Sequence, residues 1–499
     1  MTAEPLIAEE AIAIHTFGFE LHRQGRAAEA ESFYRRALHL EPEFVTAWMN
    51  LGLAHMELGN LDAAEEFERE ALRLDPDLPD AHNHLGMVHY KRGRLAEAEN
   101  CFRTALRLNP AHPHATLNLG SVRQVFDHPD EAEGLFRRAM ELGVNASHAR
   151  SNLALCMMEQ VRPEEAETLC REAIADSPNY PEAKANLALA LLTMGRLQEG
   201  WGYYETRWEV EGKNRPVPRL EQPRWTGQKL NGETVLLYAE QGFGDTLQFC
   251  RYVPKVAEAG ARVVLVVPRP LRRLMMALPG VDVLLAEDDD TLPAFDFHCP
   301  LLSLPHAFGT GLDTIPAEMP YLKGDPHAWR SVLEGLPGLK VGLVWAGKSR
   351  TDQPHAVALD KRRSMRLQDM APLFEVPGVS FVSLQLGPPA RQMRTLPEGA
   401  VLHDVSARIA DWADTADLIA GLDLVIAVDT AVAHLAGALG KPVWMLNRFD
   451  SCWRWMVGRE DTPWYPTMRI FRQHERNDWT SVIDDVRVAL EAAVARPAQ

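Results

Sequence analysis

The sequence lacks the features that would place a protein in a membrane, in a secretory pathway or on a nucleic acid. No run approaches the ~18 apolar residues of a membrane span, and the opening MTAEPLIAEEAIAIH lacks the positive start of a signal peptide. The six cysteines form no CxxC pair, which argues against a disulfide framework or a zinc site. Positive charge is scarce, since 52 Lys and Arg stand against 69 Asp and Glu. General nucleic-acid binding needs the opposite balance. We therefore expect a soluble, cytoplasmic protein with no membrane span and no nucleic-acid partner.

What the sequence has instead is a 34-residue repeat over its first two hundred positions. Small residues allow two antiparallel helices to approach closely, and Pro ends a helix because it cannot donate the next hydrogen bond. Columns of such residues keep this spacing: Gly18, Gly52, Gly86 and Gly120; Ala30, Ala64, Ala98, Ala132 and Ala166; Pro42, Pro76 and Pro110. The repeat predicts a stack of helical hairpins, an α-solenoid.

These columns resemble the tetratricopeptide repeat (TPR), and the residues around Trp48 and Pro76 carry its pattern nearly whole. The resemblance implies a TPR superhelix over 1–210, with five full repeats over 11–180 and a degenerate sixth after them. The sixth ends in the aromatic stretch WGYYETRW. We expect this stretch to be a capping helix, since a terminal repeat must cover its apolar face.

Stacked repeats of this kind expose a concave face, which usually binds a protein or a peptide. An Asn recurs near a 34-residue step on the first helix of each hairpin: Asn50, Asn83, Asn118, Asn152 and Asn186. Because an amide both donates and accepts, such a ladder can clamp an extended peptide. Two alternatives stay open. The amides can join neighbouring repeats, and the solenoid can simply hold the molecule together or dimerise it.

After the repeats the sequence changes character. Residues 211–229 are rich in Pro and read as a stiff linker. Two α/β blocks follow, at 230–337 and 338–499, and the first ends in a Pro-rich, irregular stretch at about 286–337. We expect strands at 235–238, 262–267, 281–285, 341–345, 379–384, 424–428 and 443–446, with helices between them. This alternation is typical of parallel sheets covered on both faces, whose ligands bind beyond the carboxyl ends of the strands.

The loop after the opening strand contains Gly242, Gly244 and Asp245. Two glycines let the backbone turn tightly and come close to a ligand. The loop is not a dinucleotide fingerprint, because the third glycine and the later acidic residue are missing. From the residues alone, Asp245 is either a functional carboxylate or the N-cap of the following helix.

A second strand runs directly into a helix at Asp429, Thr430 and His434. The start of a helix offers free N–H groups and the positive end of its dipole, which suits a diphosphate. Thr430 can add a hydroxyl to a phosphate, and Asp429 suits a sugar or ribose hydroxyl. His434 is either a functional residue or a histidine packed in the core.

A third cluster of cations follows the strand at 341–345 and includes Lys348 and Arg363, with Ser364 beside them. In so acidic a protein such a group can neutralise a phosphate. The alternative is an ordinary solvated loop.

Together the three loops resemble the glycosyltransferases of the GT-B fold, most closely family nine, which includes the lipopolysaccharide heptosyltransferases. The resemblance covers roughly 230–490 and is carried by GFGDT at 242–246, DTAVAHLA at 429–436 and KPV at 441–443. It implies two Rossmann-like halves, the acceptor side at 230–337 and the donor side at 338–499. The resemblance makes Asp245 the general base and gives sugar and phosphate contacts to Asp429 and Thr430. It gives Lys348 the donor phosphates, with Arg363 and Ser364 beside it.

One difference from the heptosyltransferases is Ala431, where those enzymes have Gly after Asp-Thr. The acceptor-binding N-terminal elements of those enzymes are not evident here either. We therefore do not expect ADP-heptose as the donor or a lipid A core as the acceptor. Fusion of repeats to a GT-B domain also resembles O-linked N-acetylglucosamine transferases and repeat-containing bacterial enzymes that glycosylate flagellin. We expect a metal-independent transferase without a cofactor, which moves a sugar from a nucleotide-sugar to a hydroxyl of a protein acceptor on the concave face. An inactive scaffold and a surface-polysaccharide transferase whose repeats recruit partner proteins are the alternatives.

Two further segments each have a purely structural and a functional interpretation. The acidic run at 287–290 suggests metal binding, but its Pro-flanked loop favours a solvated turn. The aromatic stretch at 453–465 either forms a wall of the donor cleft or packs across the two halves.

Overall fold

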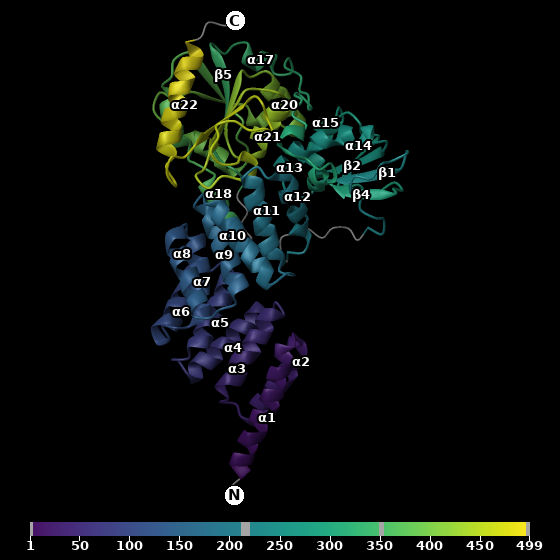
Figure 1. Cartoon of the computed structure of the whole chain (residues 1–499). Coiled ribbons are helices and arrows are strands. Elements are labelled where there is room, and N and C mark those ends of the chain that lie inside the picture. Colours follow the sequence, from purple (N-terminus) through teal and green to yellow (C-terminus); the bar gives the residue numbers. More distant parts are fainter. Residues whose placement is uncertain (1–2, 211–219, 349–353, 496–499) are drawn as a thin grey trace. The chain divides into compact units, whose positions relative to one another are not determined.

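The computed structural model describes residues 3–210, 220–348 and 354–495 (Figure 1). The chain forms two compact units. The first comprises residues 1–156 with two short later segments, and the second comprises the rest.

Five helical hairpins follow one another in the repeat region, as the 34-residue columns predict. Their helices are α1 (Ala3–Arg23), α2 (Ala27–Leu40), α3 (Val45–Glu57), α4 (Leu61–Leu74), α5 (Pro79–Lys91), α6 (Leu95–Leu108), α7 (Pro113–Val125), α8 (Pro129–Glu141), α9 (Ala146–Glu159) and α10 (Pro163–Asp176). The region is a TPR solenoid, and the predicted fold class is confirmed.

The Gly column works by close approach between the two helices of a hairpin. A Cβ on Gly86 would lie 2.6 Å from Cε1 of Phe102, and a Cβ on Gly120 would lie 2.6 Å from Cε1 of Phe136. A larger residue would therefore displace a buried aromatic ring. The Pro column acts as expected too, since α2 ends at Leu40, two residues before Pro42.

A sixth hairpin belongs to the second unit. It consists of α11 (Pro181–Thr193) and α12 (Leu197–Tyr204), followed by a 3-10 turn at Glu205–Trp208. The sequence suggested that its aromatic end caps the solenoid. Instead Trp201 is buried, with edge-to-face ring contacts to Phe249 and Trp464 of the α/β part. These aromatic partners lie far along the chain, so the hairpin is part of the α/β core.

The rest of the second unit contains two parallel sheets, as expected for two Rossmann-like halves. Their strands are β1 (Thr234–Tyr238), β2 (Arg262–Val267), β3 (Val283–Ala286), β4 (Phe297–Pro300), β5 (Leu339–Val344), β6 (Val379–Ser383), β7 (Leu402–Asp404), β8 (Leu424–Val428), β9 (Val443–Asn447) and β10 (Met468–Arg472). The helices are α13 (Phe243–Phe249), α14 (Val253–Glu258), α15 (Arg269–Met275), α16 (Leu304–Ala307), α17 (Arg330–Leu333), α18 (Pro354–Arg362), α19 (Ala371–Phe374), α20 (Trp412–Ala420), α21 (Ala431–Ala438) and α22 (Trp479–Val494).

Strand order creates one switch point in each sheet. The first sheet has the order β3-β2-β1-β4 and the second has β10-β9-β8-β5-β6-β7. In each sheet the chain forms an inner strand first, β1 or β5, and adds the next two strands on one side of it. The later strands are then added on the other side of that first strand. In open α/β sheets, ligands bind beyond the carboxyl ends of the strands at such a switch point, which here lies after β1 and β4 and after β5 and β8.

Candidate functional site

Thr430 begins the helix at the switch point of the second sheet. Val344, the last residue of β5, pairs with Ala427 of β8, so the loops after these two strands start side by side. Thr430 is the N-cap of α21, but its side chain caps no backbone N–H. Its hydroxyl is buried and has no hydrogen-bond partner in the described residues. A free hydroxyl at a helix start is suited to a phosphate or another anion, and Asp429 directly precedes it.

The loop after β5 is shaped by side chains from elsewhere in the sheet. Gln385 Oε1 accepts from the N–H groups of Trp345 and Ala346 at 3.1 and 2.9 Å. Ser364 Oγ accepts from the N–H of Gly347 at 3.1 Å. Ser364 therefore holds the loop, a role the sequence did not suggest. Lys348, the next residue, is exposed.

Arg363 also lies against this loop. A Cβ on Gly347 would be 2.8 Å from Arg363 Nε, so glycine is what admits the guanidinium. Arg363 Nη2 pairs with Asp360 Oδ1 at 2.7 Å. The structure thus brings Arg363 and Ser364 to the loop that carries Lys348. This loop starts at the same end of the sheet as the segment in which Asp429 and Thr430 lead into α21.

At the switch point of the first sheet, Asp245 has two partners. Its Oδ2 accepts from the N–H of Gly242 at 2.8 Å, which makes it part of the cap of α13. Its Oδ1 forms an ion pair with Arg454. The side chain is 18% exposed, so solvent reaches it. Asp245 therefore has the helix-start contact that one interpretation expected, together with a charged partner that the sequence did not indicate.

The two loop motifs meet at Gly244 and His434. α13 packs against α21, and a Cβ on Gly244 would lie 2.9 Å from His434 Cδ2. His434 Nδ1 lies 2.9 Å from the Tyr465 hydroxyl, and its ring stacks on Trp455 at 5.2 Å. Burial, helped by the nearby Arg454 cation, lowers the pKa of His434 to about 3. His434 is thus a neutral, packed histidine at the contact between the two motifs.

Arg454 is the residue that sequence reasoning missed. Its Nε donates to Gln248 Oε1 at 2.6 Å, and its guanidinium lies over the Trp453 ring at 4.2 Å. Arg454 reaches Asp245 across 209 positions of sequence. It lies in the aromatic stretch 453–465 that the sequence analysis singled out. Because Arg both stacks on aromatic rings and pairs with carboxylates, its place between two Trp residues is the signal that could have identified it.

The aromatic stretch around Arg454 packs across the two halves. Trp464 and Tyr465 are fully buried, and Trp464 makes an edge contact with Phe249 at 5.8 Å. Arg251 of the first half donates to the Trp464 carbonyl at 2.7 Å and lies over the Tyr465 ring. The aromatic stretch therefore packs across the two halves and fixes one against the other, as one of its two interpretations predicts.

The asparagine ladder is partly engaged within the solenoid. Asn118 Nδ2 donates to Asn83 Oδ1 at 2.9 Å, a bond between neighbouring repeats. Asn50 Nδ2 lies 2.9 Å from His15 Nε2. Asn50, Asn83 and Asn186 are buried, whereas Asn118 and Asn152 are partly exposed. The Asn83–Asn118 bond fits the inter-repeat alternative, and the peptide clamp stays a prediction.

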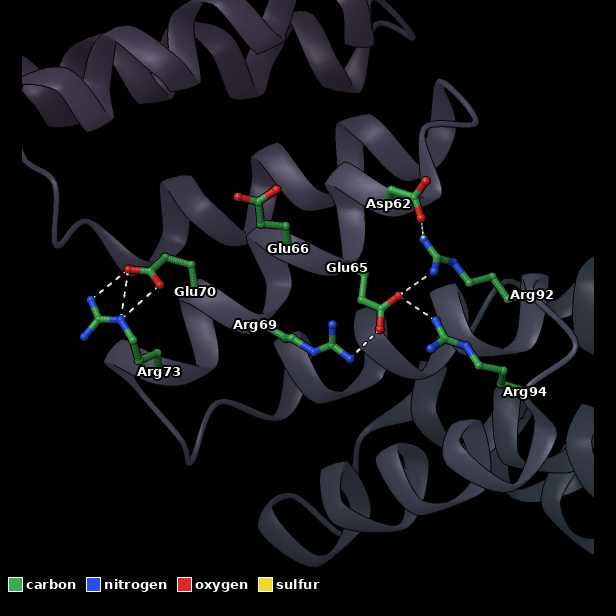
Figure 2. A pocket seen from close by; sticks show the side chains of 8 residues that line it. All are labelled: Asp62, Glu65, Glu66, Arg69, Glu70, Arg73, Arg92 and Arg94. Carbon is green, nitrogen blue, oxygen red and sulfur yellow. Dashed lines mark hydrogen bonds and ion pairs between the residues drawn. The ribbon is translucent and has the colours of Figure 1, made fainter.

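A charged pocket in the second and third repeats is a separate feature (Figure 2). Four acidic side chains and four Arg line it: Asp62, Glu65, Glu66, Glu70, Arg69, Arg73, Arg92 and Arg94. Glu65 pairs with Arg69, with Arg92 at 2.7 Å and with Arg94 at 2.5 Å. The charges of the side chains that line the pocket largely pair with one another, so the pocket does not resemble a donor site.

Metal-binding clusters and membrane-spanning helices are both absent from the described part of the chain. Within the described ranges, no three His, Cys, Asp or Glu side chains are grouped to hold a metal ion. In the acidic run, Asp288 and Asp289 pair with Arg269 at 2.6 and 2.8 Å, as a surface turn would. Among the helices of the described residues, none has the length and apolar character to cross a membrane.

Comparison with known proteins agrees with both parts of the chain. Residues 18–191 match the family described as the cilia and flagella-associated protein 70 C-terminal domain, a TPR family. Residues 410–479, which include Asp429, Thr430 and His434, match glycosyltransferase family 9 (heptosyltransferase). A TPR region thus precedes a segment that matches glycosyltransferase family 9.

Individual relatives match parts of the chain. Protein FlbA of Caulobacter vibrioides is 30% identical over 331 residues, covering 60% of this chain and 53% of FlbA. The chain thus spans about half the length of this relative. A thermophilic TPR protein of Thermus thermophilus is 23% identical, with 36% of this chain and 99% of that chain covered and a TM-score of 0.34. PilF of Pseudomonas aeruginosa is 18% identical, with 42% and 95% covered and a TM-score of 0.36.

Proposed function

We propose that this protein is a glycosyltransferase that moves a sugar from a nucleotide-activated donor to a hydroxyl group of a protein acceptor. The contact between Gly244 and His434 carries the proposal, because it brings the Asp245 loop against the helix that Thr430 begins. The family 9 match over 410–479 supports the transferase class.

On the donor side, the diphosphate is proposed to bind at the start of α21. The Thr430 hydroxyl has no partner among the described residues and can donate to a phosphate oxygen. The first N–H groups of the helix and its dipole favour the same negative charge. Lys348 in the adjacent loop and Arg363, which lies against that loop, supply cations, while Asp429 is suited to a sugar or ribose hydroxyl. With these cations present the leaving nucleotide can be stabilised without a metal ion or a cofactor.

On the acceptor side, Asp245 is proposed as the general base. As the acceptor hydroxyl attacks the anomeric carbon it must lose its proton, and a carboxylate within hydrogen-bond reach can take it. Each Asp245 oxygen has one partner, the Gly242 N–H or Arg454, and each keeps a further lone pair. Arg454 holds the carboxylate in place for this step.

The acceptor is proposed to be a protein, such as a flagellin-like protein, bound on the concave face of the repeats. The TPR region supports this, since TPR surfaces are used for protein recognition. A cytoplasmic location is proposed with it. All six cysteines are free thiols, which suits a reducing compartment.

An Asp245→Asn variant tests the proposal. The full chain would be offered a panel of nucleotide-sugars and co-expressed flagellin or another secreted protein, with transfer read by intact mass. We expect Asp245→Asn to bind nucleotide normally and to lose about 100-fold or more in transfer rate. Transfer should persist in EDTA.

Asp296→Asn is the matched control, because Asp296 Oδ2 also accepts from a backbone N–H, that of Thr234, at the opposite end of β1. This variant should keep its transfer rate. Normal transfer by Asp245→Asn would show that Asp245 is not the base. A wild-type chain that binds no nucleotide would instead support an inactive scaffold.

A further inference from the structure

The last helical hairpin of the repeat region touches the loop that carries Asp245. Tyr204 ends α12 and Arg207 lies in the 3-10 turn after it. Both are buried, and both contact residues that lie between β1 and Gly242. These contacts lie within the second unit.

Arg207 forms a bidentate ion pair with Glu240. Arg207 Nε and Nη2 lie 3.1 and 2.6 Å from the two carboxylate oxygens of Glu240. The Glu240 side chain is only 10% exposed, and its burial raises the pKa of the carboxyl even though the Arg207 cation opposes this. Such a bidentate pair fixes direction as well as distance. It anchors the chain two residues after β1 ends.

Tyr204 holds the next residue, Gln241. Gln241 Nε2 donates to the Tyr204 hydroxyl oxygen at 3.3 Å. The backbone of Gln241 has φ 61°, in the left-handed region that residues other than glycine seldom adopt. A contact that holds its side chain therefore helps to hold this turn, and Gly242 and Asp245 follow directly from it.

The same hairpin supports Asp245 from its other side. The Trp453 ring lies 6.1 Å from the Tyr204 ring and 5.3 Å from the Trp201 ring. Arg454 lies over Trp453 and pairs with Asp245. Two chains of contacts thus run from the hairpin to one carboxylate, one through the loop and one through Arg454.

We propose that the last repeat hairpin is part of the catalytic apparatus, with Tyr204 and Arg207 as positioning residues that hold the Glu240–Gln241 turn and so aim Asp245. The proposal rests on the proposed function. It means that the repeats do more than recruit an acceptor, since the final hairpin also shapes the acceptor side of the active site.

The test compares Tyr204→Phe with Tyr203→Phe in the full chain. Tyr204→Phe removes only the hydroxyl that Gln241 uses. Tyr203 is the neighbouring tyrosine and is also partly packed against the core. Among the described residues its hydroxyl has no hydrogen-bond partner. We expect Tyr204→Phe to lower kcat for transfer about tenfold, with nucleotide affinity unchanged and Tm lowered by no more than the few degrees that one lost hydrogen bond costs. Tyr203→Phe should match the wild type. An unchanged kcat in Tyr204→Phe, or an equal loss in both variants, would overturn the proposal.

Hydrogen exchange separates this proposal from the proposed function. We expect the peptide covering 239–246 to exchange faster in Tyr204→Phe than in Tyr203→Phe. If the wild type transfers no sugar, the proposed function fails, and faster exchange would still support positioning of this turn. Equal exchange in the two variants would overturn the positioning role whatever the activity.

Discussion

A buried glutamate interrupts a column of aromatic side chains in the solenoid. Tyr34, Glu68, Phe102 and Phe136 are spaced 34 residues apart, and all are buried. A Cβ on Gly52 would lie 2.6 Å from Glu68 Oε1, so Glu68 occupies the position that the rings of Phe102 and Phe136 take in the following repeats. We predict that Glu68→Phe stabilises the repeats and removes much of their pH dependence.

The electrostatic environment of Glu68 gives the expected size of this stabilisation. His84 Nδ1 lies 3.1 Å from Oε1, while Oε2 has no hydrogen-bond partner in the part of the chain that is described. Burial, only partly offset by His84, raises the pKa of the Glu68 carboxyl from 4.5 to about 7. A shift of this size corresponds to about 3 kcal/mol.

The direction in which the free energy of unfolding changes with pH follows from proton binding. Between pH 4.5 and 7 the folded state holds the Glu68 proton more tightly than the unfolded state does, so the free energy of unfolding falls as pH rises through this window. His84 acts in the same direction. Burial alone would lower the pKa of its ring, but the Glu68 contact raises it, so its stabilising contribution is also lost as pH rises.

We therefore expect Glu68→Phe to raise the free energy of unfolding by about 2–4 kcal/mol at pH 8, with a smaller gain at pH 5. Urea unfolding followed by circular dichroism at both pH values measures it, and hydrogen exchange in α4 and α5 assigns it to these repeats. Glu66→Phe is the control, since Glu66 is exposed on the same helix and no gain is expected there. Destabilisation at both pH values, or an unchanged pH dependence, would refute the reasoning.

Two further predictions concern the candidate site. Thr430→Val should leave Tm unchanged, since the hydroxyl has no partner among the described residues, but should weaken nucleotide binding about tenfold in calorimetry. An unchanged affinity would place the phosphate elsewhere. Gly244→Ala should cost about 1–3 kcal/mol in stability and reduce transfer, because its Cβ would lie 2.9 Å from a His434 ring already held by Tyr465 and Trp455. Thermal unfolding and the transfer assay measure both effects, and a variant with wild-type values would show that the loop is free to move.

The strands that the sequence revealed are those with β-branched residues. The range 262–267 was predicted with the bounds that β2 has, and 424–428 with those of β8. β4 (Phe297–Pro300) lies in the stretch expected to be irregular. Its residues FHCP have little strand preference of their own, and pairing with β1 is what makes them a strand.

The residues of the candidate site also divide into those that local sequence patterns indicate and those that they do not. The sequence already indicated that the glycines, Asp245 and the Asp429-Thr430 step lie between a strand and the start of a helix, because these elements are neighbours in the chain. Their roles in binding and transfer stay predictions. The roles of Ser364 and Arg454 were not found, because each depends on a partner distant in sequence, 17 residues away for Ser364 and 209 for Arg454.

The sequence alone determined the helical hairpins, since close helix packing demands small residues every 34 positions and neighbours in the chain supply the contacts. It also indicated the loops that follow β1, β5 and β8, where the candidate residues lie. Only the tertiary structure decided that the sixth hairpin joins the α/β core and that the aromatic stretch packs across both halves. The same holds for the pairing of Asp245 with Arg454. These features depend on side chains brought together by folding, and no local pattern records which distant residue will fill the space beside them.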